Sequence, residues 1–219
     1  MTEKNITLVK AALFLLCLWP LAWYAWGFQQ DGLGAHPVEA VSRGLGSWAL
    51  RFLLITLAVT PARKLARQPW LGRLRRMLGL FAFFYASLHG TTYLWFDQYF
   101  DWTAIANDIL ERPFITAGVA AFALLLPLAA TSGNAMIRRL GGRRWQELHR
   151  TIYAIAIIGV LHCWWMAKPD TPEPALYAVI LAVLLGLRIW WREQERRRQI
   201  AGEHLCTQQA RVIRISPRR

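Results

Sequence analysis

Charged side chains are scarce in this 219-residue chain. They make up only 18% of it, whereas hydrophobic residues make up 55% and aromatic residues 13%. A soluble domain carries about 25% charged and about 45–50% apolar residues, so the composition excludes an ordinary soluble globule. It also excludes a disordered chain, which combines low hydrophobicity with high net charge. The sequence therefore indicates an integral membrane protein.

Cysteine and the common cofactor-binding motifs are scarce as well. The three cysteines form no C-x-x-C or C-x-x-C-H pattern, which argues against a zinc ribbon and against covalently attached c-type haem. No G-x-G-x-x-G follows a predicted strand, and no P-loop is present. The chain thus lacks a recognisable nicotinamide- or FAD-binding domain. If it carries electrons, a separate protein must supply them.

Six apolar stretches approach the roughly 20 residues that a helix needs to cross the hydrocarbon core of a bilayer. They lie at residues 11–28, 46–60, 77–96, 114–130, 151–167 and 175–191. We therefore predict an all-α integral membrane protein, a bundle of six transmembrane helices. The expected parts are a cytoplasmic N-terminus at residues 1–10, a transmembrane domain at residues 11–191 and a basic cytoplasmic tail at residues 192–219.

The net charge of +13 follows from where the basic residues lie. With the N-terminus inside, the inner segments hold 22 of the 26 Lys and Arg residues; they are residues 1–10, 61–76, 131–150 and the chain from Arg188 onward. The positive-inside rule then predicts six spans with both termini in the cytoplasm. The basic residues form no continuous patch, so the charge requires no nucleic acid partner.

Three of the five histidines lie in or at the ends of predicted spans. An ionisable residue inside a membrane is costly, so a functional role is its default interpretation. Counting along the spans places His89 and His162 at similar depth, toward the outer face, on different helices. Two neutral imidazoles that face each other across a bundle are what a low-spin, bis-histidine haem iron requires. The alternative is histidines that only form hydrogen bonds between helices.

His149 marks a second level, nearer the cytoplasm. It lies 13 residues before His162, roughly 20 Å along an ideal helix and about 140° around it. A bend, or a different partner for His149, is needed if both are to serve one column of haems. Arg75 and Arg76 could hold a propionate or a flavin phosphate, or could simply flank the span. Arg51, an isolated charge within a span, should have a counter-ion, for which an outer haem propionate is one candidate.

The order and spacing of several short motifs resemble the MsrQ (YedZ) family, the haem-binding membrane subunits of bacterial MsrPQ methionine sulfoxide reductase systems. The motifs lie at residues 32–38, 60–61, 75–80, 88–89, 112–118, 140–150 and 161–162. The resemblance covers nearly the whole chain and fades in the tail. It implies a ferric-reductase-like transmembrane fold in the bacterial inner membrane, with b-type haem and FMN. His89, His149 and His162 match the haem-ligand positions of the family.

The same resemblance implies partners. Electrons would come from a cytoplasmic flavin reductase that uses NAD(P)H and would pass to a periplasmic molybdopterin subunit, MsrP, which reduces methionine sulfoxide in oxidised envelope proteins. One departure concerns the wider superfamily, whose di-haem members carry two histidines on each of two helices. Here the position 13 residues before His89 is Arg76. The inner level therefore lacks an evident second ligand. The first haem is expected between His89 and His162, and the inner level could hold a second haem on His149 or, instead, a flavin.

Two other functions remain open from the residues alone. A quinol-oxidising cytochrome b subunit would also bind haem, but its electrons would enter from the lipid phase. A small six-span transporter would contain no haem, and its histidines would only join helices.

Overall fold

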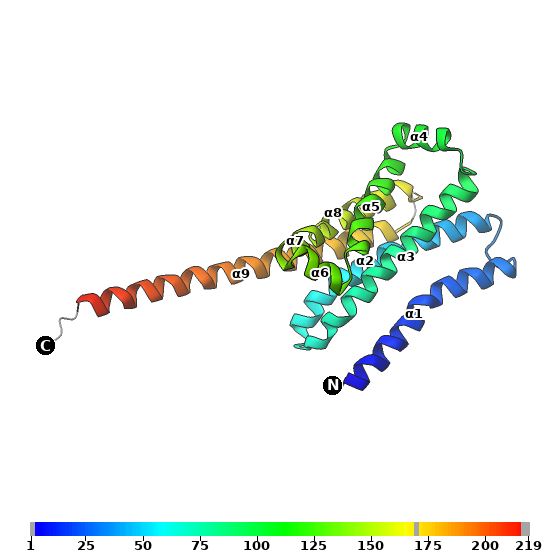
Figure 1. The fold of residues 1–219 in the computed structure, drawn as a ribbon. Coiled ribbons are helices and arrows are strands. Elements are labelled where there is room, and N and C mark those ends of the chain that lie inside the picture. The colour runs from blue at the N-terminus through cyan, green and yellow to red at the C-terminus, as the bar shows by residue number, and fades with distance from the viewer. Residues whose placement is uncertain (1–2, 169–170, 216–219) are drawn as a thin grey trace. The chain divides into compact units, whose positions relative to one another are not determined.

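The computed structural model describes residues 3–168 and 171–215, with side chains described up to Ala201. No strand occurs in these residues. In chain order the elements are α1 (Glu3–Gln29), α2 (Pro37–Leu65), η1 (Pro69–Leu74), α3 (Arg75–Thr92), η2 (Tyr93–Asp97), α4 (Trp102–Glu111), α5 (Pro113–Ala130), α6 (Asn134–Leu140), α7 (Gly142–His149), α8 (Ile152–Met166) and α9 (Glu173–Ile215) (Figure 1).

A helix lies at the position of each predicted span: α1, α2, α3, α5, α8 and α9. Within the described residues, four of these, α1, α2, α5 and α9, are long and apolar enough to cross a membrane. Helix α3 begins with two arginines, and α8 has only 15 residues, fewer than the roughly 20 that a span needs. The all-helical, membrane-spanning architecture is confirmed, and the number of six spans stays a prediction.

Neighbouring elements extend both of these shorter helices. The π-helix η2 continues α3 directly, and α7 leads into α8 through Arg150 and Thr151. At this junction the amides of Thr151 and Tyr153 donate to carbonyls three residues back, each at 3.1 Å, instead of the four residues of an α-helix. The junction lies between His149 and His162. The angle of an ideal helix therefore does not apply to these two side chains.

The connections contain helices that hydropathy did not predict. Helix α4 lies between the third and fifth α-helices, and Asp101 caps it by accepting hydrogen bonds from the amides of Thr103 at 2.9 Å and Ala104 at 3.1 Å. Helices α6 and α7 are joined at Gly141, whose φ of 79° suits a residue without a side chain. Amphipathic segments this short give little hydropathy signal, which is why they were missed.

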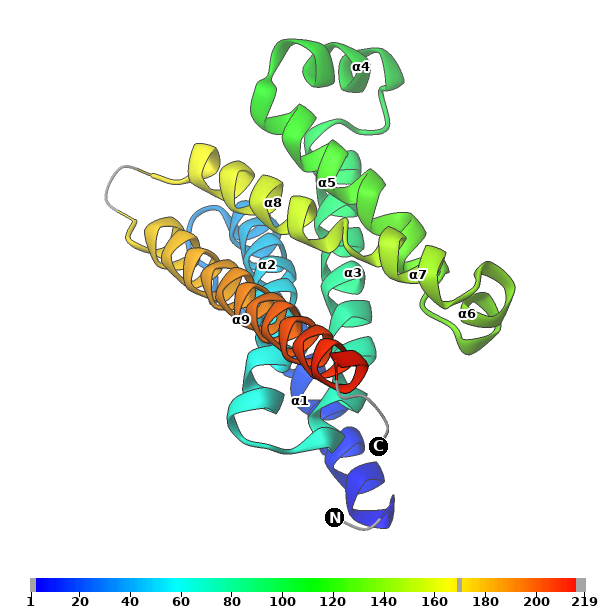
Figure 2. The ribbon, with the colours of Figure 1, turned by 90° about the vertical axis from the view of Figure 1, so that its left-hand side faces the viewer.

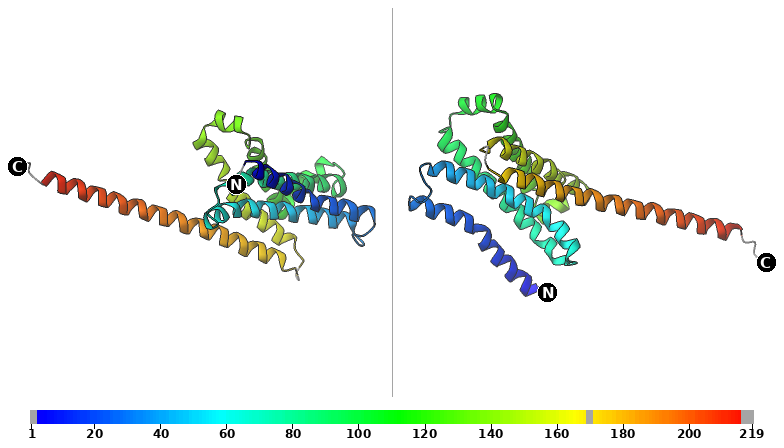
Figure 3. Two further views of the ribbon diagram at one scale, coloured as in Figure 1. Left: turned by 90° about the horizontal axis from the view of Figure 1, so that it is seen from below. Right: turned by 180° about the vertical axis from the view of Figure 1, so that it is seen from behind.

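The chain divides into two compact units, residues 1–181 and 182–219. In the first unit, α2 packs most extensively against α3, and α5 packs against α8 (Figure 2). Its largest fully buried side chains are Leu57 and Tyr85. Helix α1 buries few side chains along its length, and it lies at one edge of this unit (Figure 3). The second unit is the continuation of α9, which stays helical through Ile215, in the stretch predicted to form the tail.

Tyr85 joins α3 to α1. Its hydroxyl donates to the carbonyl of Cys17 at 2.7 Å and accepts from the amide of Leu21 at 3.2 Å. Cys17 and Leu21 are four residues apart, so they are the two ends of one rung of the helical hydrogen-bond ladder. Pro20, which has no amide proton, lies next to this rung. A side chain inserted at a ladder beside a proline bends a helix, and here it also fastens α1 to α3.

Other contacts join segments that the charge pattern assigns to the same side of the membrane. Arg73 in η1 donates to Glu3 at the start of α1 at 2.7 Å. Toward the opposite ends of the helices, Arg43 of α2 donates to the carbonyl of Met166, the last residue of α8, at 3.0 Å. These pairings agree with the predicted grouping of the connections. Which group faces the cytoplasm stays a prediction.

Candidate functional site

His89 near the end of α3 and His162 near the end of α8 lie side by side. Their ring centroids are 6.2 Å apart, and the ring planes are inclined by 62°. A bond between a metal and an imidazole nitrogen is about 2 Å long, so two imidazoles on opposite sides of one metal have ring centres about 6 Å apart. The separation of the two rings is therefore that of a bis-histidine metal site.

The same kind of hydrogen bond orients both rings. Nδ1 of His89 lies 2.9 Å from the carbonyl oxygen of Ser42 in α2, and Nδ1 of His162 lies 2.8 Å from the carbonyl oxygen of Phe114 in α5. A carbonyl can only accept, so Nδ1 carries the proton in both rings. Nε2 is then the unprotonated nitrogen that can bind a metal. A backbone acceptor at the other ring nitrogen is the usual support of a metal-ligating histidine.

A glycine makes room for each ring. A Cβ at Gly46 in α2 would lie 3.2 Å from ring atoms of His89, and a Cβ at Gly118 in α5 would lie 3.0 Å from a ring carbon of His162. Each glycine lies four residues after the residue whose carbonyl binds the same ring. Two helix pairs, α2 with α3 and α5 with α8, thus present their histidines in the same way.

The chemistry of these donors fits haem. Two neutral imidazoles supply two axial ligands, and a porphyrin supplies the other four nitrogens around the iron. In the part of the chain that the structure describes, no three His, Cys, Asp or Glu side chains cluster closely enough to hold a metal by themselves. Both histidines are half-buried, so neither ring is sealed within the packed core.

His149, the last residue of α7, has a different environment. Its ring stacks on Trp145 with centroids 4.1 Å apart, and its Nε2 lies 3.1 Å from the hydroxyl oxygen of Thr131. That hydroxyl gives its one proton to the carbonyl of Pro127, at 2.6 Å. Nε2 of His149 therefore donates to Thr131. It is the protonated nitrogen here, unlike in the other two histidines.

The structure does not bring His149 to the His89–His162 pair. Burial, and then the positive charge of Arg75, lowers the pKa of His149, so the neutral ring is favoured. Arg75 is the first residue of α3, 14 residues and about 21 Å of helix before His89. His149 and Arg75 thus form a separate inner level. The neighbouring Arg76 donates to the side-chain oxygen of Asn134 at the start of α6.

Arg51 of α2 has its partners within the chain. Its Nε donates to the hydroxyl of Tyr177 at 2.8 Å, and its Nη2 lies 3.7 Å from Oε1 of Glu173. The guanidinium also lies 4.9 Å from the ring centroid of Trp48. Glu173 is thus a counter-ion of Arg51. From the sequence, a haem propionate was one candidate for this role. Because the two side chains are 35% and 52% exposed, solvent screens this ion pair.

The sequence patterns assigned no role at this site to Ser42, Gly46, Phe114 or Gly118, although Phe114 and Gly118 lie in the motif at residues 112–118. A signal for the glycines was present, because a glycine in an apolar helix marks a close approach by a neighbouring helix. Nothing in the sequence identified the two carbonyls, because every residue has one. Their selection depends on how the helices pack.

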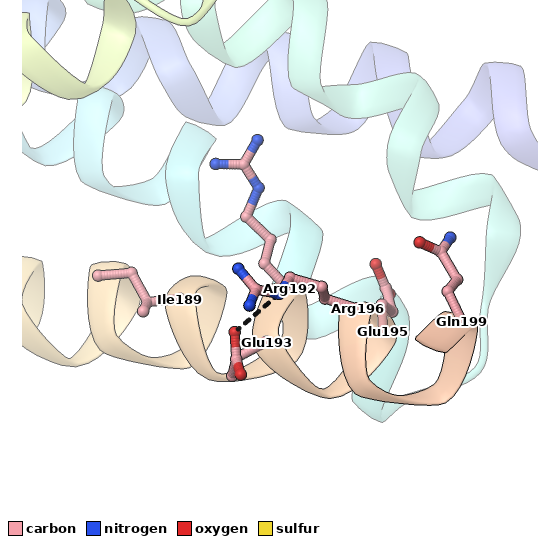
Figure 4. A pocket seen from close by; sticks show the side chains of 6 residues that line it. All are labelled: Ile189, Arg192, Glu193, Glu195, Arg196 and Gln199. Atoms are coloured by element: carbon pink, nitrogen blue, oxygen red, sulfur yellow. Dashed lines mark ion pairs between the residues drawn. The ribbon is translucent and has the colours of Figure 1, made fainter. Parts of the chain in front are cut away.

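The second unit has a surface of a different kind. Arg192, Glu195, Arg196 and Gln199 project from one side of α9, and Nε of Arg196 lies 3.9 Å from Oε2 of Glu193 (Figure 4). These side chains are mixed in charge and include no histidine or cysteine. They resemble a solvated helix face.

Comparison with known families identifies the transmembrane part. The family described as "Ferric reductase like transmembrane component" matches residues 44–160. The match contains Gly46, His89, Gly118 and His149, and it ends two residues before His162.

Comparison with curated proteins gives relatives over almost the full length. A protein of Herminiimonas arsenicoxydans is 51% identical over 209 residues, which cover 94% of this chain and 96% of the relative. One of Azospira oryzae is 56% identical, covering 90% of this chain and 83% of the relative. One of Xanthomonas campestris pv. campestris is 51% identical, covering 90% and 94%. All three are named "Protein-methionine-sulfoxide reductase heme-binding subunit MsrQ".

Proposed function

Because the chain belongs to the MsrQ family, we propose that it is a membrane b-type cytochrome of a methionine sulfoxide reductase system. It passes electrons from a cytoplasmic flavin reductase that uses NAD(P)H, across the bacterial inner membrane, to a periplasmic molybdopterin subunit of the MsrP type. That partner reduces methionine sulfoxide in oxidised periplasmic proteins. This chain binds the electron carriers and does not touch the sulfoxide.

The observation that carries the proposal is the pair of imidazoles 6.2 Å apart, each held at Nδ1 by a backbone carbonyl. His89 and His162 would hold the haem iron through Nε2, and their Nδ1 hydrogen bonds fix the tautomer and raise the basicity of Nε2. Gly46 and Gly118 let the rings lie against the neighbouring helices. When bound, the haem supplies a one-electron carrier within the bilayer. The surrounding apolar helices keep water from it.

We place the FMN at the inner level, with Arg75 and Arg76 as its phosphate-binding residues. A guanidinium can bind two phosphate oxygens with bidentate geometry. Nε2 of His149 donates to Thr131, and Arg76 occupies the position 13 residues before His89 where a second histidine ligand would lie. This arrangement favours a flavin over a second haem at this level.

The haem assignment is tested on the purified full-length chain. We expect a Soret band and a reduced α-band, and we expect His89→Ala and His162→Ala to lose most of the haem in a pyridine haemochrome assay. His36→Ala, at an exposed position, and His149→Ala should keep the outer haem. A colourless wild-type protein from haem-replete cells would instead favour a transporter. Full haem content in both ligand variants would also contradict the assignment.

The electron donor is tested on the same preparation. Reduction of the haem by NAD(P)H plus a flavin reductase supports the proposed route, and flavin extraction then reports FMN. Reduction by a quinol alone would contradict that route and favour the quinol-oxidising alternative. Arg75→Gln with Arg76→Gln should lower the flavin content and leave the outer haem in place.

A further inference from the structure

The two histidines of the site differ in what lies beside their Nδ1. His162 has the carbonyl of Phe114 at 2.8 Å, from a residue with no polar side chain. His89 has the carbonyl of Ser42 at 2.9 Å and, in addition, the hydroxyl oxygen of Ser42 at 3.4 Å. Both acceptors come from one residue of α2. The two axial positions are therefore not equivalent.

A second hydroxyl extends this contact. The hydroxyl oxygen of Thr92 in α3 lies 3.0 Å from the hydroxyl oxygen of Ser42. The Thr92 hydroxyl also donates to the carbonyl of His89 at 2.7 Å. A hydroxyl has only one proton, and Thr92 uses its proton in the shorter bond, to the carbonyl of His89. The proton of Ser42 then points to Thr92, and the Ser42 oxygen presents its lone pairs to Nδ1–H of His89. The three residues form a closed ring of hydrogen bonds between α2 and α3.

We propose that Ser42 and Thr92 are positioning residues that fix the ring of His89 and increase its electron donation to the metal. This inference rests on the proposed function, because it assigns a role toward the haem bound between His89 and His162. The hydroxyls act through His89 and do not touch the iron. Among the described contacts, no hydroxyl bonds to Nδ1 of His162, the histidine on α8.

The direction of the effect follows from the hydrogen bonds. A hydroxyl that donates to a second hydroxyl becomes a stronger acceptor at its own oxygen, since neighbouring hydrogen bonds reinforce one another. Here Ser42 donates to Thr92 and accepts from Nδ1–H of His89. A stronger acceptor at Nδ1–H makes the imidazole a better electron donor, which stabilises the ferric state. Removing the hydroxyls should therefore favour reduction of the haem. It should also change the orientation of the His89 ring, which the carbonyl of Ser42 alone then holds.

The test compares Ser42→Ala and Thr92→Val with two matched controls on the full-length haem-loaded protein. Ser87→Ala and Thr91→Val remove hydroxyls of α3 that, among the described residues, bond to carbonyls of their own helix, at 2.9 and 2.8 Å. We expect each test variant to shift the reduction equilibrium about threefold toward the ferrous state, about 30 mV for one electron. The g-values of the ferric haem in electron paramagnetic resonance should change as well. Thr92→Ser, which keeps the hydroxyl, should restore the wild-type values.

The outcomes separate this inference from the proposed function. If haem stays bound and both test variants keep the wild-type potential and g-values, the positioning role is wrong while the proposed function stands. Equal shifts in the control variants would also overturn it. If the wild-type chain binds no haem, or His89→Ala keeps it, the proposed function itself fails. If Ser42→Ala loses haem while Ser42→Thr, which keeps a hydroxyl, retains it, the positioning role of Ser42 is supported.

Discussion

An imidazole ring can reach the backbone of a neighbouring helix only where that helix has no side chain in the way. At the scale of single residues this condition defines the site. His89 and His162 each meet a carbonyl, and each meets a glycine four residues further along the same helix. The glycine is as much a part of the ligand's environment as the hydrogen-bond acceptor.

The first prediction concerns these glycines. In Gly46→Ala and Gly118→Ala the new Cβ would lie 3.2 and 3.0 Å from ring atoms, so each imidazole must move by several tenths of an ångström. Overpacking of this kind costs about 1–3 kcal/mol. We expect a lower haem-to-protein ratio and a shifted Soret maximum, measured by absorption and the haemochrome assay.

Gly90→Ala is the matched control for these variants. It lies beside His89 in α3, but a Cβ there would meet nothing within 4 Å. It should keep the wild-type haem content. If Gly46→Ala and Gly118→Ala kept it too, the proposed fit between the rings and these glycines would be wrong.

At the scale of helices, Tyr85 connects α3 to α1 through two hydrogen bonds. Tyr85→Phe leaves the carbonyl of Cys17 and the amide of Leu21 without the hydroxyl that bridges them. We expect the free energy of unfolding to fall by about 1 kcal/mol. Thermal unfolding in detergent measures it, with Tyr99→Phe as the control because Tyr99 is 80% exposed. Equal unfolding temperatures for the two variants would show that the bridge does not stabilise the protein.

Arg51 connects α2 to the start of α9. A double-mutant cycle with Arg51→Gln and Glu173→Gln should give a coupling free energy of about 0.2–1 kcal/mol, small because the pair is partly exposed. The haem content should be unchanged in all three variants, because Arg51 already has a carboxylate partner. Haem loss in Arg51→Gln but not in Glu173→Gln would instead assign Arg51 to a propionate.

Hydropathy located the main helices because burial in lipid requires long apolar runs, and residue counting along them placed His89 and His162 at one depth. The α7–α8 junction was not predictable, because Arg150 and Thr151 keep helical backbone angles and carry no proline or glycine. Likewise, the sequence could not show that Arg51 meets Glu173. That contact depends on how distant helices pack.

At the scale of the whole molecule, the distribution of basic residues makes a prediction about topology. In a chain whose own cysteines have been replaced, Thr103→Cys in α4 and Gly133→Cys before α6 lie on the two sides of α5. An impermeant thiol reagent added to intact cells should label Thr103→Cys, and Gly133→Cys only after permeabilisation of the inner membrane. The physical reason is the excess of Lys and Arg on the inner side. The reverse pattern would invert the predicted orientation.

The bond from Tyr85 to α1 also bears on the order of assembly in the membrane. Transmembrane helices enter the bilayer with their own ladders complete and associate afterwards. α1 is the first of the described helices to be synthesised, and Tyr85 belongs to a later one, so the bridge between Cys17 and Leu21 cannot form until α3 has arrived. Helix α1 therefore reaches its final shape only after α3 is in place.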